Sequence, residues 1–215
     1  MLKEAIQKLE LKKDLTELEA GEVAEMLFRG EGDEALVETF LTLLAQKGES
    51  VSEITGFARV MREKSLRVNL NGVDAVDTCG TGGSKLLRFN TSTTVAFVLA
   101  SLGVKVAKHG NRAASGRCGS FDLLEELGIR IELSPEEVES AVRGMGLGFM
   151  FAPLFHPAMK FVAPIRKKLG FRTIFNLLGP LANPALVKRQ IIGVPSKEIG
   201  EKMINALKLL GHTQA

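Results

Sequence analysis

The densest group of reactive side chains in the sequence lies in one nine-residue segment. It runs Lys-His-Gly-Asn-Arg-Ala-Ala-Ser-Gly from Lys108 to Gly116 and follows an apolar stretch, 104–107, that is typical of a strand. A bound diphosphate needs several hydrogen-bond donors and positive charge at the same place. The segment therefore predicts an anion site, and a solvated basic loop is the alternative. The candidate residues are Lys108, His109, Gly110, Asn111, Arg112, Ala113, Ala114, Ser115 and Gly116.

A glycine-rich turn precedes that segment. Gly80, Gly82, Gly83 and Ser84 stand between a predicted strand at 73–76 and a predicted helix at 92–102. Glycines let the main chain approach an anion closely, and successive amides then surround phosphate oxygens. The helix that follows adds the partial positive charge of its N-terminus. An ordinary strand-to-helix turn is the alternative.

The start of that helix is unusually rich in short polar side chains. Asn90, Thr91, Ser92 and Thr93 follow one another there. One such residue would suffice as a helix cap, so the run of four favours phosphate binding, with the Ser92 hydroxyl as a possible metal ligand. Ser120, at the next predicted helix start, fits either a cap or a phosphate contact.

Four further residues are ambiguous from sequence. His156 precedes Pro157, where it fits a helix entry. Arg166 fits either a solvated charge or a planar fork for a carboxylate. The two cysteines, Cys79 and Cys118, are interpreted as small packing residues with reduced thiols.

The first 65 residues predict helices only. Thr16 with Glu19, and Ser50 with Glu53, form capping boxes ahead of apolar stripes at helical spacing, and Asp33 can cap a helix between them. Because each stripe needs a partner, we expect a small helical bundle over residues 1–68.

Strands and helices alternate over residues 69–215. Strands are predicted at 73–76, 104–107, 129–133, 149–151 and 190–194, and helices around 92–102, 123–127 and 196–210. A further helix starts at Ser134, and residues 157–169 are predicted to be helical with an interruption at Pro164. This order predicts an α/β domain with a mostly parallel central sheet, which binds ligands at the carboxyl ends of its strands. A further strand normally follows such a last helix, so we expect a chain truncated at its C-terminus.

Composition narrows the possible functions. The 215 residues are 45% apolar and 25% charged, with a net charge of +3. This balance is typical of a folded domain and favours neither a nucleic-acid nor a membrane partner. With no recognisable leader and no long apolar run, the expected location is cytoplasmic.

Five motifs in order carry a resemblance. They are Gly80-Thr81-Gly82-Gly83, Asn90-Thr91-Ser92-Thr93, Lys108-His109-Gly110-Asn111-Arg112-Ala113, His156-Pro157-Ala158-Met159-Lys160, and the stretch from Arg172 to Pro184, RTIFNLLGPLANP. Together, and over essentially the whole chain, the sequence closely resembles the anthranilate phosphoribosyltransferase family.

The resemblance implies a fold of the nucleoside phosphorylase/phosphoribosyltransferase type and usually a homodimer. It implies transfer of phosphoribosyl from phosphoribosyl pyrophosphate to the amine of anthranilate, in tryptophan biosynthesis, with Mg²⁺. Matching positions imply that Ser92 is a magnesium ligand and that Lys108 and Arg112 stabilise the departing pyrophosphate. Gly80, Asn111 and Arg166 resemble anthranilate contacts, with Arg166 facing the carboxylate, and His109 and His156 resemble walls of its channel. The phosphoribosyl pyrophosphate contacts implied are Gly80, Gly83, Ser84, Arg88, Asn90, Ser92, Thr93, Lys108, Asn111, Arg112, Ser115, Gly116 and Ser120.

Two departures from the family pattern stand out. Ser84 replaces the usual Asp, and Arg88 stands where many relatives have Thr. The family's adjacent Asp-Glu magnesium pair would lie beyond Ala215. Three alternatives follow: a pyrimidine nucleoside phosphorylase, a non-catalytic nucleic-acid-binding relative, and a folded but inactive fragment.

Overall fold

The computed structural model describes residues 1–82, 89–113 and 118–215. Four helices open the chain: α1 (Leu2–Glu10), α2 (Glu17–Phe28), α3 (Glu34–Lys47) and α4 (Val51–Glu63). The predicted capping boxes at Thr16 and Ser50 and the Asp33 cap are all present. They fix where α2, α3 and α4 begin, because each side-chain oxygen accepts a hydrogen bond from an otherwise unpaired amide.

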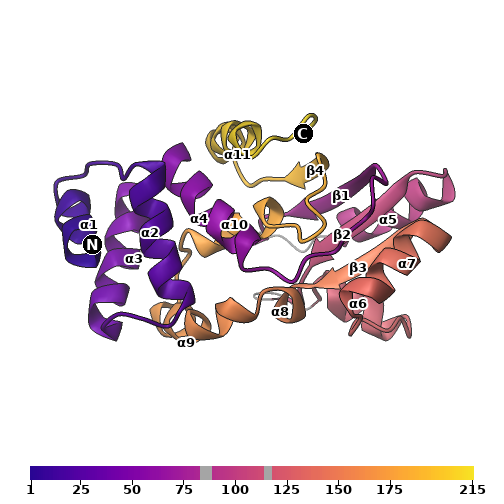
Figure 1. Ribbon diagram of the computed structural model, residues 1–215, viewed down its shortest axis with the longest axis horizontal. Helices are drawn as coiled ribbons and strands as arrows, with labels where there is room; N and C mark the ends of the chain where they lie inside the picture. The colour runs from indigo at the N-terminus through magenta and orange to yellow at the C-terminus, as the bar shows by residue number, and fades with distance from the viewer. Residues whose placement is uncertain (83–88, 114–117) are drawn as a thin grey trace.

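The core of this helical part is completed by helices from much later in the chain. Its buried cluster extends from α1–α4 into α10 (Phe175–Leu181) and α11 (Lys197–Leu209), and side chains of α9 (Ala163–Leu169) pack against it. Phe175 makes edge-on contacts with Phe28 and Phe57, with ring centroids 6.0 and 5.9 Å apart. The apolar stripes predicted from sequence therefore pack partly against helices from much later in the chain (Figure 1).

The other part is built on a four-stranded parallel sheet. Its strands are β1 (Ala75–Gly80), β2 (Lys105–Gly110), β3 (Leu147–Phe151) and β4 (Arg189–Gly193), in the order β3-β2-β1-β4. All three pairings are parallel. The prediction of an α/β domain beside a small helical domain is confirmed.

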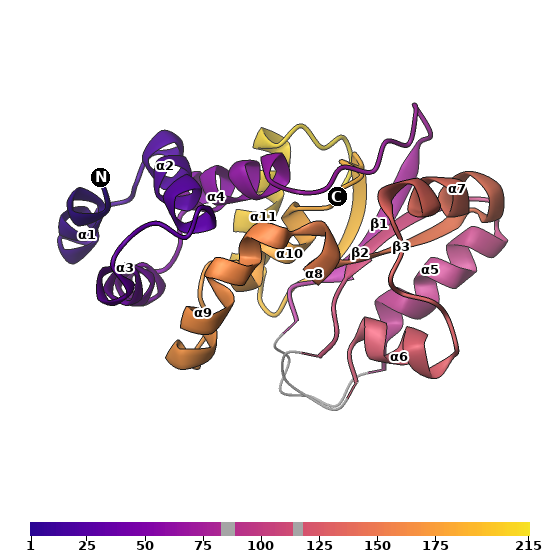
Figure 2. The same cartoon turned by 60° about the horizontal axis from the view of Figure 1, so that its bottom comes forward.

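Helices lie on both faces of the sheet. The first face carries α5 (Thr91–Ser101) and α6 (Ser120–Glu126), where Phe121 and Leu124 pack with Phe149 and Phe151 of β3. The second face carries α7 (Pro135–Met145) and α10, with Val138 of α7 packed with Ala107. The short helices α8 (Ala152–Phe155) and η1 (Pro157–Phe161) lead from β3 towards the helical part (Figure 2).

One predicted element is wrong. Residues 129–133 form no strand: Ile131 is buried by side-chain packing in the cluster around Phe121, without pairing to β3. The helical stretch predicted at 157–169 is interrupted near Pro164 as expected and is divided into η1 and α9, because Pro164 has no amide proton to continue a hydrogen-bonded helix from η1. The first strand also begins two residues later and ends four residues later than predicted.

No helix in the part of the chain that the structure describes is long and apolar enough to cross a membrane.

Candidate functional site

The two candidate anion-binding segments, the glycine turn and the Lys108 segment, lie at the carboxyl ends of two parallel strands. Gly80 ends β1 and Gly110 ends β2, and these neighbouring strands run parallel in register (Figure 2). The Thr78 hydroxyl donates a hydrogen bond of 2.7 Å to the Ser92 carbonyl, which fixes the start of α5 beside the end of β1. The structure thus brings the glycine turn, the Asn90–Thr93 run and the Lys108 segment together.

Lys108 lies in the middle of this junction. It belongs to β2, so the prediction that it starts a loop is wrong, and its side chain is only 1% exposed. The ammonium donates to the main-chain carbonyl of Thr78 and lies 3.4 Å from the Ser92 hydroxyl. Burial lowers the pKa of Lys108, and the nearby Asp77 carboxylate opposes that shift. A buried cation therefore joins the end of β1 to the first turn of α5.

His109 points to the opposite face of the sheet, because side chains alternate along a strand. Its Nδ1 lies 3.1 Å from the Gly179 carbonyl of α10, and its main-chain amide donates to Asp77 Oδ1 over 3.2 Å. Gln190 of β4 donates to the other Asp77 oxygen over 3.1 Å. Lys108 and His109 are therefore adjacent in sequence, but their side chains contact elements on opposite faces of the sheet.

His156 meets His109 on that second face. The two rings are edge to face with centroids 4.9 Å apart, and both side chains are buried. Neither ring nitrogen of His156 makes a well-formed hydrogen bond within the described residues, and the same is true of His109 Nε2. Burial, with a smaller contribution from His109, lowers the pKa of His156 to about 3. Burial also lowers the pKa of His109. Both imidazoles are therefore neutral at physiological pH.

The N-terminus of α5 has no side-chain cap. Asn90 occupies the capping position, but its side-chain amide donates instead to the Gly119 carbonyl over 3.4 Å and lies 3.5 Å from Cys118 Sγ. The capping interpretation of Asn90 is therefore wrong. An uncapped helix start retains its partial positive charge for a ligand. The Thr91 and Thr93 amides already donate to the Phe89 and Asn90 carbonyls, over 2.7 and 3.0 Å. Thr91 is exposed and Ser92 half-buried, whereas Thr93 is completely buried.

The segment after β2 is held by side chains of α6. Ser120 donates to the Asn111 carbonyl over 3.0 Å, so it does not cap its own helix. Arg112 forms two 2.7 Å hydrogen bonds with Glu125 and lies 4.7 Å from the centre of the Phe151 ring. Ala113 donates its amide to Asp122 over 2.8 Å. In this arrangement the Arg112 guanidinium binds a carboxylate of the protein itself.

Glycines make the close turns of this edge possible. A Cβ on Gly119 would lie 2.3 Å from the Ala113 amide nitrogen, so only glycine allows the two backbones to approach. Gly82 has φ of +68°, which L side chains rarely adopt. The predicted ligand contacts Gly83, Ser84, Arg88, Ala114, Ser115 and Gly116 lie outside the described residues.

Arg166 lies on α9, apart from the strand ends. Its guanidinium is 5.5 Å from the centre of the Phe175 ring, and burial lowers its pKa. No carboxylate among the described residues lies within ion-pair distance of Arg166. Helix α10 links the two places, since Phe175 at its start contacts Arg166 and Gly179 near its end binds His109.

The described residues offer few ligands for a magnesium ion. Ser92 offers one hydroxyl oxygen, and no group of three His, Cys, Asp or Glu residues suited to a metal occurs within residues 1–82, 89–113 and 118–215. Mg²⁺ commonly keeps several waters and binds substrate phosphates through few protein ligands. A hydroxyl beside the anion site fits that mode.

Sequence reasoning missed Asp77, Thr78 and Gln190. All three are buried and polar, and they make the hydrogen bonds that hold the strand ends in place. Polar residues inside an otherwise apolar strand were the available signal, because a buried polar group needs a partner.

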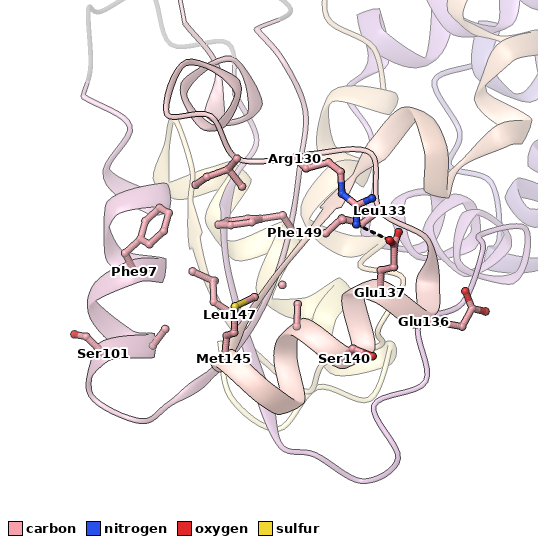
Figure 3. A pocket seen from close by; sticks show the side chains of 14 residues that line it. Phe97, Ser101, Arg130, Leu133, Glu136, Glu137, Ser140, Met145, Leu147 and Phe149 are labelled. Carbon is pink, nitrogen blue, oxygen red and sulfur yellow. Dashed lines mark hydrogen bonds and ion pairs between the residues drawn. The ribbon is translucent and has the colours of Figure 1, made fainter.

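A cavity of about 920 Å³ lies elsewhere, beside the edge strand β3. Figure 3 shows it between α5 and α7, lined by Phe97, Leu133, Leu147 and Phe149, with the Arg130–Glu137 ion pair beside it. It reaches Ser101 and Met145, the last residues of α5 and α7, at the end of the sheet opposite to Asn90. Its lining is mainly apolar and includes none of the candidate anion-binding residues.

The fold is that of a helical bundle joined to a parallel α/β domain, with the buried Lys108 beside the carboxyl ends of two adjacent strands. Protein-family models match both parts. Residues 72–215 match the model "Glycosyl transferase family, a/b domain", and residues 3–65 match "Glycosyl transferase family, helical bundle domain". The chain belongs to the glycosyl transferase family that these two models describe. The predicted domain boundary at 68/69 falls in the gap between the models and stays a prediction.

Two curated relatives are named anthranilate phosphoribosyltransferase. The chain is 52% identical over 207 residues to anthranilate phosphoribosyltransferase of Dehalococcoides mccartyi, covering 96% of this chain and 60% of the relative. It is 50% identical over 214 residues to the Chloroflexus aggregans protein of that name, covering 100% and 63%. The chain thus spans 60–63% of the length of these curated relatives.

Solved structures agree. Anthranilate phosphoribosyltransferase from Thermus thermophilus superposes with a TM-score of 0.91 at 47% identity, over 97% of this chain and 63% of that one. The Saccharomyces cerevisiae enzyme in complex with PRPP and Mg gives a TM-score of 0.91 at 29% identity, over 99% and 64%.

Proposed function

We propose that the whole protein transfers the phosphoribosyl group of phosphoribosyl pyrophosphate to the amine of anthranilate, releasing pyrophosphate, in tryptophan biosynthesis. The observation that carries this proposal is the junction at Lys108, where the end of β1, the uncapped start of α5 and the end of β2 meet around a buried cation. The names of the relatives support the choice of reaction.

The carboxyl ends of β1 and β2, together with the start of α5, form the strand-end edge, which is the proposed binding site of the diphosphate. Amides of the glycine turn and the Ser92 amide of α5 donate to phosphate oxygens, and the buried Lys108 ammonium supplies positive charge next to Ser92. Arg112 joins this group when it exchanges Glu125 for the ligand. As predicted, we assign to this region Gly80, Gly82, Gly83, Ser84, Arg88, Asn90, Ser92, Thr93 and Ser120. The Thr93 side chain is buried there, and its main-chain amide donates to the Asn90 carbonyl over 3.0 Å.

The acceptor subsite lies between the strand ends and α9. Arg166 is partly buried and has no carboxylate partner among the described residues, which suits an aromatic acid's carboxylate. The neutral rings of His109 and His156 provide an uncharged wall beside Gly179. A structure of the yeast enzyme in complex with 4-fluoroanthranilate supports an aromatic acid as the acceptor.

The proposed reaction forms a bond from the amine nitrogen to the anomeric carbon and breaks the bond from that carbon to the pyrophosphate oxygen. Pyrophosphate leaves with the bonding electron pair, and the amine loses one proton. Lys108, Arg112 and the surrounding amides stabilise the negative charge that develops on the leaving group. Positioning of the two reactants supplies the remaining acceleration, without a covalent intermediate on the protein.

Magnesium is the proposed cofactor, supported by the yeast structure in complex with PRPP and Mg. Bound to the diphosphate, it would neutralise charge on the leaving group. Ser92 would supply one oxygen ligand. Its hydroxyl is 3.4 Å from Lys108 Nζ, so the lysine must share this oxygen with the ion.

We further propose a cytoplasmic homodimer that binds neither nucleic acid nor membrane. Free thiols at Cys79 and Cys118 support a reducing compartment, and the net charge of +3 supports a small-molecule rather than a nucleic-acid partner. The nucleoside phosphorylase alternative is not favoured, because the relatives compared above are all named for anthranilate.

Calorimetric titration tests the proposal. Phosphoribosyl pyrophosphate is titrated into the whole protein with and without Mg²⁺, followed by anthranilate. We expect saturable binding of the donor that Mg²⁺ strengthens, and acceptor binding that needs the donor. Absence of donor binding under both conditions, or phosphorolysis of thymidine by the whole protein, would contradict the proposal.

A further inference from the structure

Arg62 is a buried arginine of the helical part that contacts the ends of two other helices. It lies on α4 and is 7% exposed. Its Nε donates to the Leu181 carbonyl over 2.5 Å, and its Nη1 donates to the Leu210 carbonyl over 3.3 Å. Leu181 is the last residue of α10, and Leu210 follows directly on α11.

These helix ends take the place of a carboxylate. No acidic group among the described residues lies within ion-pair distance of Arg62. Burial lowers its pKa to about 10, so the guanidinium is still protonated at neutral pH. The last carbonyls of a helix carry partial negative charge and have no partner within the helix. Two such ends therefore provide the counter-charge for one buried cation.

The contact at Leu181 belongs to a series. The Gly179 carbonyl of α10 lies 3.1 Å from His109 Nδ1 of β2, and the Pro180 carbonyl accepts a 2.8 Å hydrogen bond from Gln190 of β4. Leu181 then accepts from Arg62 of α4. Three successive carbonyls are thus bonded to side chains from three different elements. The position of this short turn depends on all three contacts together.

We propose that Arg62 is a positioning residue. From the helical part it fixes the last turn of α10, and through Gly179 it fixes the orientation of His109 next to the candidate site. Arg62 touches neither the strand-end edge nor Arg166, so its effect on ligand binding is indirect. The part of this inference that concerns ligand binding rests on the proposed function, whereas the part that concerns His109 does not.

Histidine NMR tests the inference on the full 215-residue chain. In the unchanged protein, long-range proton–nitrogen correlations should show His109 protonated on Nδ1 and bonded to the Gly179 carbonyl. Arg62→Lys keeps the charge but lacks the fork that reaches two carbonyls. We expect the His109 nitrogen signals to move towards a mixture of tautomers, and phosphoribosyl pyrophosphate affinity to fall roughly 5-fold.

The matched control is Arg59→Lys. Arg59 lies one turn earlier on α4, is exposed, and contacts Glu17 and the Leu209 carbonyl, with no hydrogen bond to α10 among the described residues. This variant should leave the His109 signals where they are. Equal movement in both variants, or unchanged His109 signals in Arg62→Lys, would overturn the proposal.

A second variant, Arg62→Met, removes the charge and should move the same signals further. If it fails to fold, Arg62→Lys still decides the question. If the unchanged protein does not bind phosphoribosyl pyrophosphate, the proposed function fails, and the His109 signals continue to test the role of Arg62.

Discussion

The imidazole of His109 lies edge to face against that of His156, with ring centroids 4.9 Å apart, in the space between the sheet and the helices that lead away from it. The two rings come from segments far apart in the chain. Each is kept neutral by burial, and the pKa of His156 falls to about 3. This pair makes the fold sensitive to acid.

The free energy of unfolding should therefore decrease as the pH is lowered. Between the ordinary histidine pKa and about 3, the unfolded chain takes up a proton that buried His156 cannot accept. Its contribution is present above the ordinary pKa and is lost as the pH falls. For His156 this loss is on the order of 2 kcal/mol between about pH 7 and about pH 5. Urea unfolding of His156→Leu should show a shallower pH dependence over that interval, and an unchanged slope would contradict this assignment.

Loss of Lys108 should weaken donor binding. In Lys108→Met the phosphates lose a buried cation, and hydrogen bonds to charged groups contribute about 1.5–3 kcal/mol, or roughly 10–100-fold in affinity. Calorimetry with phosphoribosyl pyrophosphate measures the change. Lys105→Met, on the same strand but with its ammonium on the Arg143 carbonyl, is the matched control and should bind as the unchanged protein does. Equal affinities of the two variants would remove Lys108 from the site.

Arg166→Ala should act on the acceptor rather than on the donor. In the whole protein we expect the Michaelis constant for anthranilate to rise by roughly 10-fold or more, because a charged hydrogen bond is lost, with a much smaller change for phosphoribosyl pyrophosphate. Steady-state kinetics with each substrate varied in turn gives both constants. Lys167→Ala, an exposed neighbour on α9, serves as the control. The reverse pattern would refute the assignment of Arg166.

Gly119→Ala should destabilise the protein and disturb the segment after β2. The added methyl group would lie 2.3 Å from the Ala113 amide nitrogen, so one of the two backbones must move. Overpacking of this kind costs about 1–3 kcal/mol. Gly144→Ala is the control: it lies in α7 with no atom within 4 Å of the new methyl group, and should stabilise by roughly 0.5–1 kcal/mol. Thermal unfolding compares the two variants.

The sequence predicted most of the local structure. Thr16, Asp33, Ser50 and Ser134 start helices where expected, because capping depends on residues three positions apart. The alternation of apolar stretches predicted four of the strands and the parallel sheet. This alternation wrongly predicted a strand at 129–133. Ile131 is buried there by side-chain packing alone, and a short apolar run of this kind has the same sequence pattern as a strand.

The sequence by itself determined which residues gather at one edge of the sheet, because parallel strands joined through helices place their carboxyl ends together. Only the tertiary structure decided what each of them contacts. It buried Lys108 against the Thr78 carbonyl, turned His109 to the other face, and paired Arg112 with Glu125. Such contacts join residues far apart in the chain, and they depend on how helices pack on a sheet, which no local spacing encodes.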